Sequence, residues 1–135
     1  MAEAIIKGIV GSGLLAPENI FVGNPTQKRC DYLNEKYHVQ AMSDNKAAVA
    51  DADLVIFAVK PQVAPVALTE DLMGAMKKGA WVLSIMSSIS IEQLHKYAPG
   101  CPVIRTMPNT PLAVGAGMTA ISVSYTHLTL PTIRL

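Results

Sequence analysis

The sequence predicts an α/β protein with a doubly wound parallel sheet. Two apolar runs, 54–59 and 81–85, contain β-branched residues, and such runs are typical of strands buried on both faces of a parallel sheet. Helix start and stop signals separate these runs from each other and from shorter candidate strands. Strands that alternate with helices at short spacing favour parallel order, so a Rossmann-like arrangement is expected.

The first half of the chain is expected to begin with an amphipathic helix. Isoleucines and a valine recur on one face of residues 1–11, and Gly11 and Gly13 supply a stop signal. Pro25 and Thr26 then open a helix that runs to about Tyr37. The other elements expected here are strands at 20–22 and 39–41 and a short helix through Ala50 that has Ser43 or Asp44 as its N-cap.

The second half repeats the alternation of strands and helices. Pro61 stands where a first helical turn would begin, so a helix is expected from there to about Met76, kinked near Pro65. Ser90 and Gln93 have the spacing of a capping box, which predicts another helix start. Strands are expected at 54–59, 81–85, 103–106 and 118–121.

Composition limits the partners that this chain is expected to have. Half of its 135 residues are hydrophobic and 16% are charged, which suits a packed core. The net charge of +1 gives no reason to expect nucleic acid or an anionic membrane as a partner. No run approaches the roughly 18 apolar residues of a membrane span, and Glu3 precedes Lys7 at the N-terminus, unlike a signal peptide. A cytoplasmic location is therefore predicted.

The two cysteines, Cys30 and Cys101, lack the spacing of a metal site. Reduced thiols are expected for them, with a disulfide as the alternative. The three histidines are scattered along the sequence, so no metal site is predicted.

Polar residues follow several of the predicted strands. In open parallel sheets ligands bind outside the carboxyl ends of the strands, and Asn24, Lys60, Ser87 and Asn109 are expected there. The segment 107–111 has two prolines, so it loses little entropy when it meets a ligand. Within it, Asn109 and Thr110 offer an amide and a hydroxyl that would orient a small polar substrate.

Four segments in order resemble pyrroline-5-carboxylate reductase: 53–62 (Asp-Leu-Val-Ile-Phe-Ala-Val-Lys-Pro-Gln), Ser84, 105–111 (Arg-Thr-Met-Pro-Asn-Thr-Pro) and 114–118 (Val-Gly-Ala-Gly-Met). The two proline-containing loops are quite specific in this order, and the resemblance extends from Met1 to about Ile121. It implies reduction of 1-pyrroline-5-carboxylate to L-proline by hydride transfer from NADPH or NADH, the last step of proline biosynthesis.

The resemblance also implies roles for residues. Ala58, Val59, Lys60 and Pro61 would line the ribose and nicotinamide, mostly through backbone groups, although Lys60 has an alternative as a solvated lysine. The family commonly has Ala-Ala-Gly where this chain has Met86, Ser87 and Ser88, and the bulkier side chains would crowd the nicotinamide. Asn109 and Thr110 would contact the substrate or hold their loop, and no catalytic residue is expected within this chain.

The adenosine end of the cofactor is expected near the second polar loop. NAD-specific proteins place an acid after this strand, whereas Asn24, Thr26 and nearby Lys28 would accept a 2′-phosphate, which favours NADPH. The alternative for Asn24 is an ordinary Asn-Pro turn. Asn45 matches a family position near the adenine, with a helix-start residue as the alternative.

Two departures from the family predict a fragment that is inactive alone. The family opens with a strand and a glycine-rich turn, which are expected to be lacking here, because Gly11 and Gly13 lie at a helix end and fail the dinucleotide fingerprint. The family also has a helical C-terminal domain through which the parent would form a homo-oligomer. We therefore interpret 1–122 as an incomplete NAD(P)-binding domain and 123–135 as a non-native tail, with a strand of alternating faces as the alternative for the tail.

Two other classes of protein are alternatives. One is another NADP-dependent dehydrogenase of the same fold, such as a 3-hydroxyacid type, which the 107–111 loop argues against. The other is a non-catalytic nucleotide-binding or receiver-like module. Receivers need acids at the strand ends, where this chain has Lys60 and Asn109.

Overall fold

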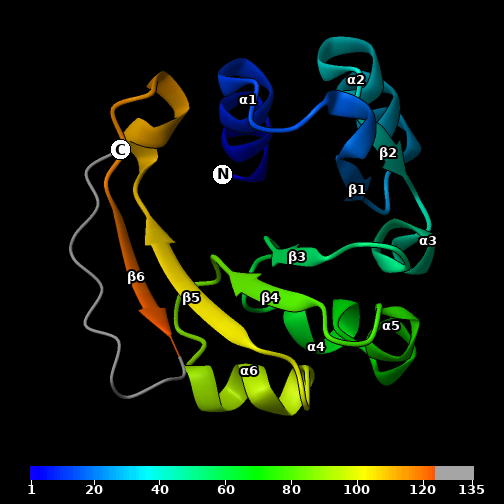
Figure 1. Ribbon diagram of the computed structural model, residues 1–135, viewed down its shortest axis with the longest axis vertical. Helices are drawn as coiled ribbons and strands as arrows, with labels where there is room; N and C mark the ends of the chain where they lie inside the picture. The colour runs from blue at the N-terminus through cyan, green and yellow to red at the C-terminus, as the bar shows by residue number, and fades with distance from the viewer. Residues whose placement is uncertain (124–135) are drawn as a thin grey trace.

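A computed structural model describes residues 1–123 (Figure 1). Its helices are α1 (Ala2–Ser12), α2 (Gln27–Tyr37), α3 (Asn45–Val49), α4 (Ala64–Ala67), α5 (Glu70–Ala75) and α6 (Ile91–Tyr97), with two 3₁₀ helices, η1 (Pro17–Asn19) and η2 (Thr110–Val114). Its strands are β1 (Phe21–Gly23), β2 (Gln40–Met42), β3 (Leu54–Phe57), β4 (Trp81–Ser84), β5 (Val103–Pro108) and β6 (Thr119–Val123). The α/β class is therefore confirmed. Apart from Val123, which ends β6, the predicted tail lies outside the described residues.

The strands form two sheets. One pairs β1 with β2 in parallel, and the other has the order β3-β4-β5-β6. Strands β3, β4 and β5 run parallel, but β6 is antiparallel to β5, so the expectation of an all-parallel sheet is wrong at this edge. The physical reason is the short connection: 109–118 holds only η2, which reverses the chain instead of carrying it across the sheet.

The two sheets are not joined to each other. Within residues 1–123, β1 pairs only with β2, and β3 pairs only with β4, so each has one unpaired edge. The sequence predicts that the opening strand of the family is lacking, and the unpaired edges of β1 and β3 agree with that expectation. An exposed edge of this kind is a site for pairing with another strand.

Each sheet has its own core. In Figure 1, α4, α5 and α6 lie together on one side of the four-stranded sheet. Their apolar side chains pack with alternate residues of β3, β4 and β5, and this core includes Val55, Phe57, Ala64, Leu72, Val82, Leu94 and Val103. The second core joins α1 and α2 to the two-stranded sheet through Ile6, Cys30, Leu33, Val39 and Ala41.

The strands β3 and β4 are not buried on both faces as expected. Their residues alternate between buried and accessible, and the paired residues Leu54 and Trp81 are 48% and 44% exposed. The three helices that pack on this sheet cover the face that carries Val55 and Val82. Apolar composition therefore predicted the strands correctly but overestimated their burial.

The predicted kinked helix from Pro61 to Met76 is two helices. The Val63 N–H bonds to the Lys60 carbonyl in a turn (2.8 Å), and α4 begins after it with Pro65 in its first turn. The chain then leaves the helix at Leu68, and Thr69 caps α5 by accepting the Leu72 N–H. Pro65 therefore starts a helix instead of kinking one, because the first turn tolerates its missing N–H.

The helix starts at the other sites are confirmed. Asp44, rather than Ser43, caps α3 by accepting the N–H groups of Lys46 and Ala47. Ser90 and Gln93 form the predicted capping box at the start of α6. The glycine at position 13 ends α1 with φ 68°, so the Gly11–Gly13 segment lies at a helix C-terminus and not at a nucleotide-binding turn.

A cluster of side chains around Glu3 joins α1 to α2. The Glu3 carboxylate accepts hydrogen bonds from the Tyr37 hydroxyl (2.8 Å) and the Tyr32 hydroxyl (3.0 Å). It also forms ion pairs with Arg29 (2.5 Å) and Lys36 (3.2 Å). The Tyr37 hydrogen bond, followed by those from Arg29, Lys36 and Tyr32, lowers the pKa of Glu3 from 4.5 to about 2.

Replacing Glu3 with glutamine is expected to lower stability at neutral pH but not in strong acid. A carboxyl whose pKa is lower in the folded state stabilises the fold above its unfolded pKa of about 4.5, and this contribution is lost as pH falls toward 2. The expected loss is about 1 kcal/mol near neutral pH, discounted for the partly exposed partners. Urea denaturation at several pH values measures it, with exposed Glu18→Gln as the control. A difference that stays constant from neutral pH to about pH 2 would contradict the assignment.

Candidate functional site

The loop that follows β1 is fixed by three hydrogen bonds. The Asn24 side-chain Oδ1 accepts the Thr26 N–H (3.0 Å), and the Asn24 N–H donates to the Met42 carbonyl of β2 (3.0 Å). The Cys30 Sγ donates to the Asn24 carbonyl (3.4 Å). Asn24 thus forms a turn, as its alternative interpretation as an Asn-Pro turn expects. The turn uses the side-chain oxygen, so the Nδ2 group can still donate a hydrogen bond.

Asn45 lies next to this loop at the start of α3. Strands β1 and β2 are parallel and in register at Gly23 and Met42, so the segments that follow them leave the sheet at the same edge. The side chain of Asn45 packs directly against Gly23. Asn24, Thr26 and Asn45 are therefore brought together at the carboxyl end of the two-stranded sheet. Sequence reasoning missed Gly23, although a glycine within a strand is a signal of close approach.

The segment after β3 does not continue the strand. Strand β3 ends at Phe57, so Ala58 and Val59, predicted as strand residues, belong to the loop. Val59 packs against the core, Lys60 is exposed, and the carbonyl groups of Lys60 and Pro61 accept the N–H groups that start the next turn. Two carbonyl groups of this loop are therefore already hydrogen-bonded within the protein.

Met86 is buried in the core and does not face the predicted site. Its side chain is 1% exposed and packs among the core residues under β4. Val82, Ser84 and Met86 alternate inward, and the Met86 N–H donates to the buried Ser84 Oγ (3.2 Å). The Met86 side chain therefore lies in the core and would not crowd the cofactor, whereas Ser87 is exposed at the strand end.

Ser88 has a backbone conformation that favours glycine. Its φ is 60°, in the left-handed region, and its side chain is exposed. Most residues with a Cβ pay a steric penalty there. Glycine, which the reductase family commonly has at this position, would adopt this backbone conformation without the strain.

Replacing Ser88 with glycine is therefore expected to raise the free energy of unfolding by about 1 kcal/mol, because glycine adopts positive φ without strain. Ser87→Gly is the matched control, since Ser87 is also exposed but is not among the residues with positive φ. This control is expected to lose stability through the added entropy of the unfolded chain. Urea denaturation of both variants measures the effect, and equal losses in both would contradict it.

The predicted substrate loop is shorter than expected. Strand β5 continues through Met107 and Pro108, and Thr110 begins η2. Asn109 exchanges two bonds with Met118: its N–H donates to the Met118 carbonyl (3.2 Å), and its Oδ1 accepts the Met118 N–H (2.9 Å). Asn109 therefore holds the loop, as one of its two predicted roles requires, and Thr110 is exposed beside it.

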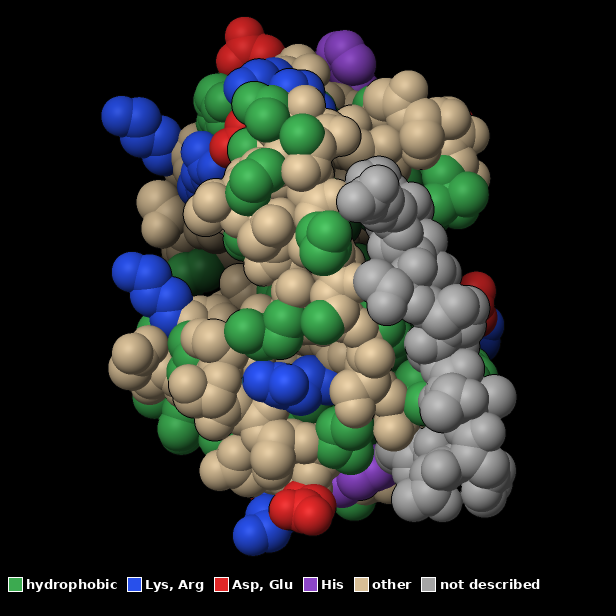
Figure 2. Space-filling view, turned by 90° about the vertical axis from the view of Figure 1, so that its left-hand side faces the viewer, with side chains coloured by type: hydrophobic (Ala, Val, Ile, Leu, Met, Phe, Trp, Pro, Cys, Tyr) green, Lys and Arg blue, Asp and Glu red, His purple; other side chains and the backbone are tan. Residues whose placement is uncertain are grey.

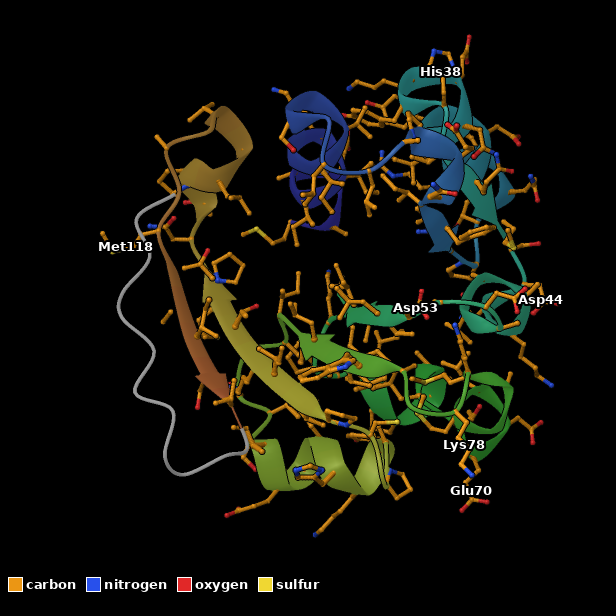
Figure 3. The ribbon with its side chains drawn as sticks, viewed as in Figure 1. His38, Asp44, Asp53, Glu70, Lys78 and Met118 are labelled. Carbon is orange, nitrogen blue, oxygen red and sulfur yellow. The ribbon has the colours of Figure 1, made fainter. Side chains whose placement is uncertain are left out.

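The candidate residues form two groups on separate sheets. In Figure 3, Asp44, beside Asn45 in the chain, lies on the opposite side of the view from Met118, the partner of Asn109. The segments after β3, β4 and β5 leave their parallel sheet at one edge. An open depression of about 700 Å³ lies elsewhere, beside α6 and β6, and Ile89, Arg105 and Ser122 line it. None of the predicted site residues lines this depression.

The described residues were also searched for free thiols, metal-ligand clusters and membrane-spanning helices. Cys30 and Cys101 are both free thiols. Residues 1–123 contain no group of three or more potential ligand side chains that would suit a metal ion. None of the helices described there has the length and apolar character needed to cross a bilayer.

Comparison with known proteins identifies the family. Residues 1–88 match the family model described as NADP oxidoreductase, coenzyme F420-dependent. The chain belongs to this family. It is similar to pyrroline-5-carboxylate reductase from Synechocystis, with 42% identity over 122 residues, 90% of this chain and 45% of the relative. The resemblance predicted from the sequence is confirmed.

Two solved structures have folds similar to that of this chain. The pyrroline-5-carboxylate reductase of Coxiella burnetii matches with a TM-score of 0.85 and 28% identity over 95% of this chain and 47% of that chain. The pyrroline carboxylate reductase of Plasmodium falciparum, solved with NADP bound, shares the fold at a TM-score of 0.77 and 23% identity over 94% of this chain and 45% of that chain. The chain thus spans about half the length of the relatives that it matches.

Proposed function

We propose that this chain is the nucleotide-binding part of a pyrroline-5-carboxylate reductase, whose substrate is the cyclic imine 1-pyrroline-5-carboxylate and whose product is L-proline. The main support is the 42% identity with the Synechocystis reductase over 90% of this chain. The fold alone would not distinguish this reaction from that of another dehydrogenase. Reduction of a C=N bond in a cytoplasmic enzyme of proline biosynthesis is the activity that we propose.

The cofactor is proposed to be NADPH or NADH, which supplies the hydride when bound. Asn24 and Thr26 would hold the adenosine ribose, and Asn45 would lie near the adenine. The contact of the Asn45 side chain with Gly23 and the turn at Asn24 support this, because they bring these polar groups to one edge of the sheet. Asn24 stands where NAD-specific proteins have an acid, so the neutral amide favours NADPH. The backbone of Ala58–Pro61 and the exposed Ser87 would lie along the nicotinamide ribose.

Substrate orientation is proposed for the loop after β5. The Asn109 Oδ1 and N–H are both used to bind Met118, which fixes the position of Thr110 at the next residue. The Nδ2 of Asn109 and the Thr110 hydroxyl would then be free to orient a small polar substrate. No residue of this chain is proposed as the acid; a hydroxyl or a water in the helical domain would give the proton to the imine nitrogen.

The domain organisation is also a proposal. Residues 1–122 would form an NAD(P)-binding domain that is completed by a strand between β1 and β3, because these strands have the unpaired edges. A helical domain would form the homo-oligomer and complete the substrate pocket. Figure 2 shows hydrophobic side chains scattered over one face of the protein. The exposed apolar residues of β5, η2, β6 and the segment before β6 are Met107, Val114, Ile121 and Met118. Residues 123–135 are proposed to be non-native.

The proposed function predicts turnover only when an opening strand and a helical domain complete the described fold. The chain is titrated with NADPH and NADH while the fluorescence of the bound cofactor is followed. The opening strand and the helical domain of a related reductase are then appended, and cofactor oxidation with 1-pyrroline-5-carboxylate is measured. We expect no turnover by the chain alone and saturable turnover by the extended protein. If the extended protein folds and binds cofactor but does not reduce the imine, the proposed reaction is wrong.

A further inference from the structure

Arg105 is a half-buried cation that lines the open depression beside α6 and β6. Its Nε donates to the Ile89 carbonyl (2.8 Å), which fixes the plane of the guanidinium. One of its two terminal nitrogens lies 3.6 Å from the Met107 Sδ, a weak acceptor. The ion pairs within residues 1–123 join other side chains and leave Arg105 without a carboxylate there. Its terminal N–H groups can therefore donate to a planar carboxylate.

Glu92 brings the opposite charge to the same depression. It lies in the first turn of α6, its side chain is exposed, and it also belongs to none of the ion pairs in the described part of the chain. Arg105 and Glu92 thus line one depression without pairing with each other. Two opposite charges that are held apart are complementary to a ligand that carries both charges itself.

The other walls of the depression add hydroxyl groups and apolar surface. Ser122 lines it and is paired with Arg105 in the register of β5 and β6, so the two side chains lie on the same face of the sheet. Ser88 adds a second hydroxyl, Ile89 an apolar side chain and His95 an imidazole. The volume of about 700 Å³ lies within the range of small-molecule sites.

We propose that this depression binds the zwitterion of a small α-amino acid. The carboxylate of the ligand binds the Arg105 guanidinium, and its ammonium group lies toward the Glu92 carboxylate. The site goes beyond the proposed function, because none of the residues proposed to hold the nucleotide or the substrate lines it. Since the depression is open and Glu92 is exposed, we expect weak binding in the millimolar range.

The test titrates L-proline into the full, isotope-labelled chain and follows the amide chemical shifts by NMR. Acetate, which has the carboxylate alone, is the second probe. The choice of L-proline rests on the proposed function, whose product it is, whereas the site itself does not. Arg105→Gln removes the cation and Glu92→Gln removes the negative charge. Glu70→Gln is the matched control for Glu92→Gln, because Glu70 is also exposed in the first turn of a helix but does not line the depression.

We expect L-proline to shift the amide signals of Ser88, Ile89 and Ser122 saturably. Glu92→Gln should weaken L-proline binding about threefold without weakening acetate binding, as for the loss of one exposed charge pair. Arg105→Gln should weaken both probes about tenfold, as for the loss of a hydrogen bond to a charged group. Because Glu92 is exposed, its variant keeps the test valid if Arg105→Gln fails to fold.

Three results overturn the zwitterion site: no saturable shifts with L-proline, acetate binding as tight as that of L-proline, or equal effects of Glu92→Gln and Glu70→Gln. Shifts confined to residues 107–111 also overturn it, because they would place the amino acid in the loop proposed for the substrate. None of these results contradicts the proposed function, which depends on turnover by the extended protein.

Discussion

Replacing Met86 with alanine is expected to lower the free energy of unfolding by about 3 kcal/mol. Met86 is one of the largest fully buried side chains, and its loss leaves a cavity beneath β4 among the core residues that α4, α5 and α6 contribute. The conservative Met86→Leu keeps the volume and should cost less than about 1.5 kcal/mol. Urea denaturation of both variants measures the difference.

The same pair of variants tests where Met86 points. Because its side chain lies in the core, the nucleotide affinity of the folded Met86→Leu protein should equal that of the unaltered chain. A loss below about 1 kcal/mol for Met86→Ala would show that the side chain is not packed as the structure has it. A change in nucleotide affinity of Met86→Leu at unchanged stability would restore the cofactor contact predicted from the sequence.

Replacing Asn34 with alanine is expected to cost about 2 kcal/mol, because two backbone groups lose their partner at once. The Asn34 side chain, from α2, donates its Nδ2 to the Ala41 carbonyl (2.9 Å) and accepts the Ala41 N–H at Oδ1 (2.5 Å). These two hydrogen bonds satisfy the Ala41 backbone groups on the edge of β2 that faces away from β1. Since β2 leads directly into Asn45, the loss would also loosen the candidate nucleotide site.

The control for this prediction is Asn34→Asp, which keeps the shape and the acceptor but loses the donor. Its loss at neutral pH should lie between zero and that of Asn34→Ala, as measured by urea denaturation. Equal losses for the two variants would mean that the donor carries the whole effect. A loss under about 0.5 kcal/mol for alanine would show that water replaces the side chain at this edge.

Local sequence signals predicted the helix starts well because they act over three or four residues. Ser90 with Gln93, and Asp44 before α3, cap their helices as the spacing predicts. The helix after Pro61 was harder, since the missing proline N–H is compatible with a turn, a first helical turn or a kink. In the structure a turn lies there, and the Val63 N–H donates a hydrogen bond to the Lys60 carbonyl within it.

The candidate site could be predicted only in part. The positions of Asn24, Asn45 and Asn109 at strand ends follow from the order of strands and loops. The direction of a side chain does not follow from that order. Met86 was assigned to the site by resemblance to the family, which commonly has Ala-Ala-Gly at 86–88. The alternation of side chains along β4, continued from Val82 and Ser84, would have placed it in the core.

The sequence by itself determined the α/β class, the parallel pairing of β3, β4 and β5, and the resemblance to the reductases. Hydrophobic runs, caps and short motifs are each encoded within a few residues. Only the tertiary structure decided the reversal of β6, the burial of Met86, the bond of Asn109 to Met118 and the approach of Asn45 to Gly23. These features join residues that are distant in the chain or depend on which side of a strand faces the helices. Such contacts are set by packing in three dimensions, which no local pattern specifies.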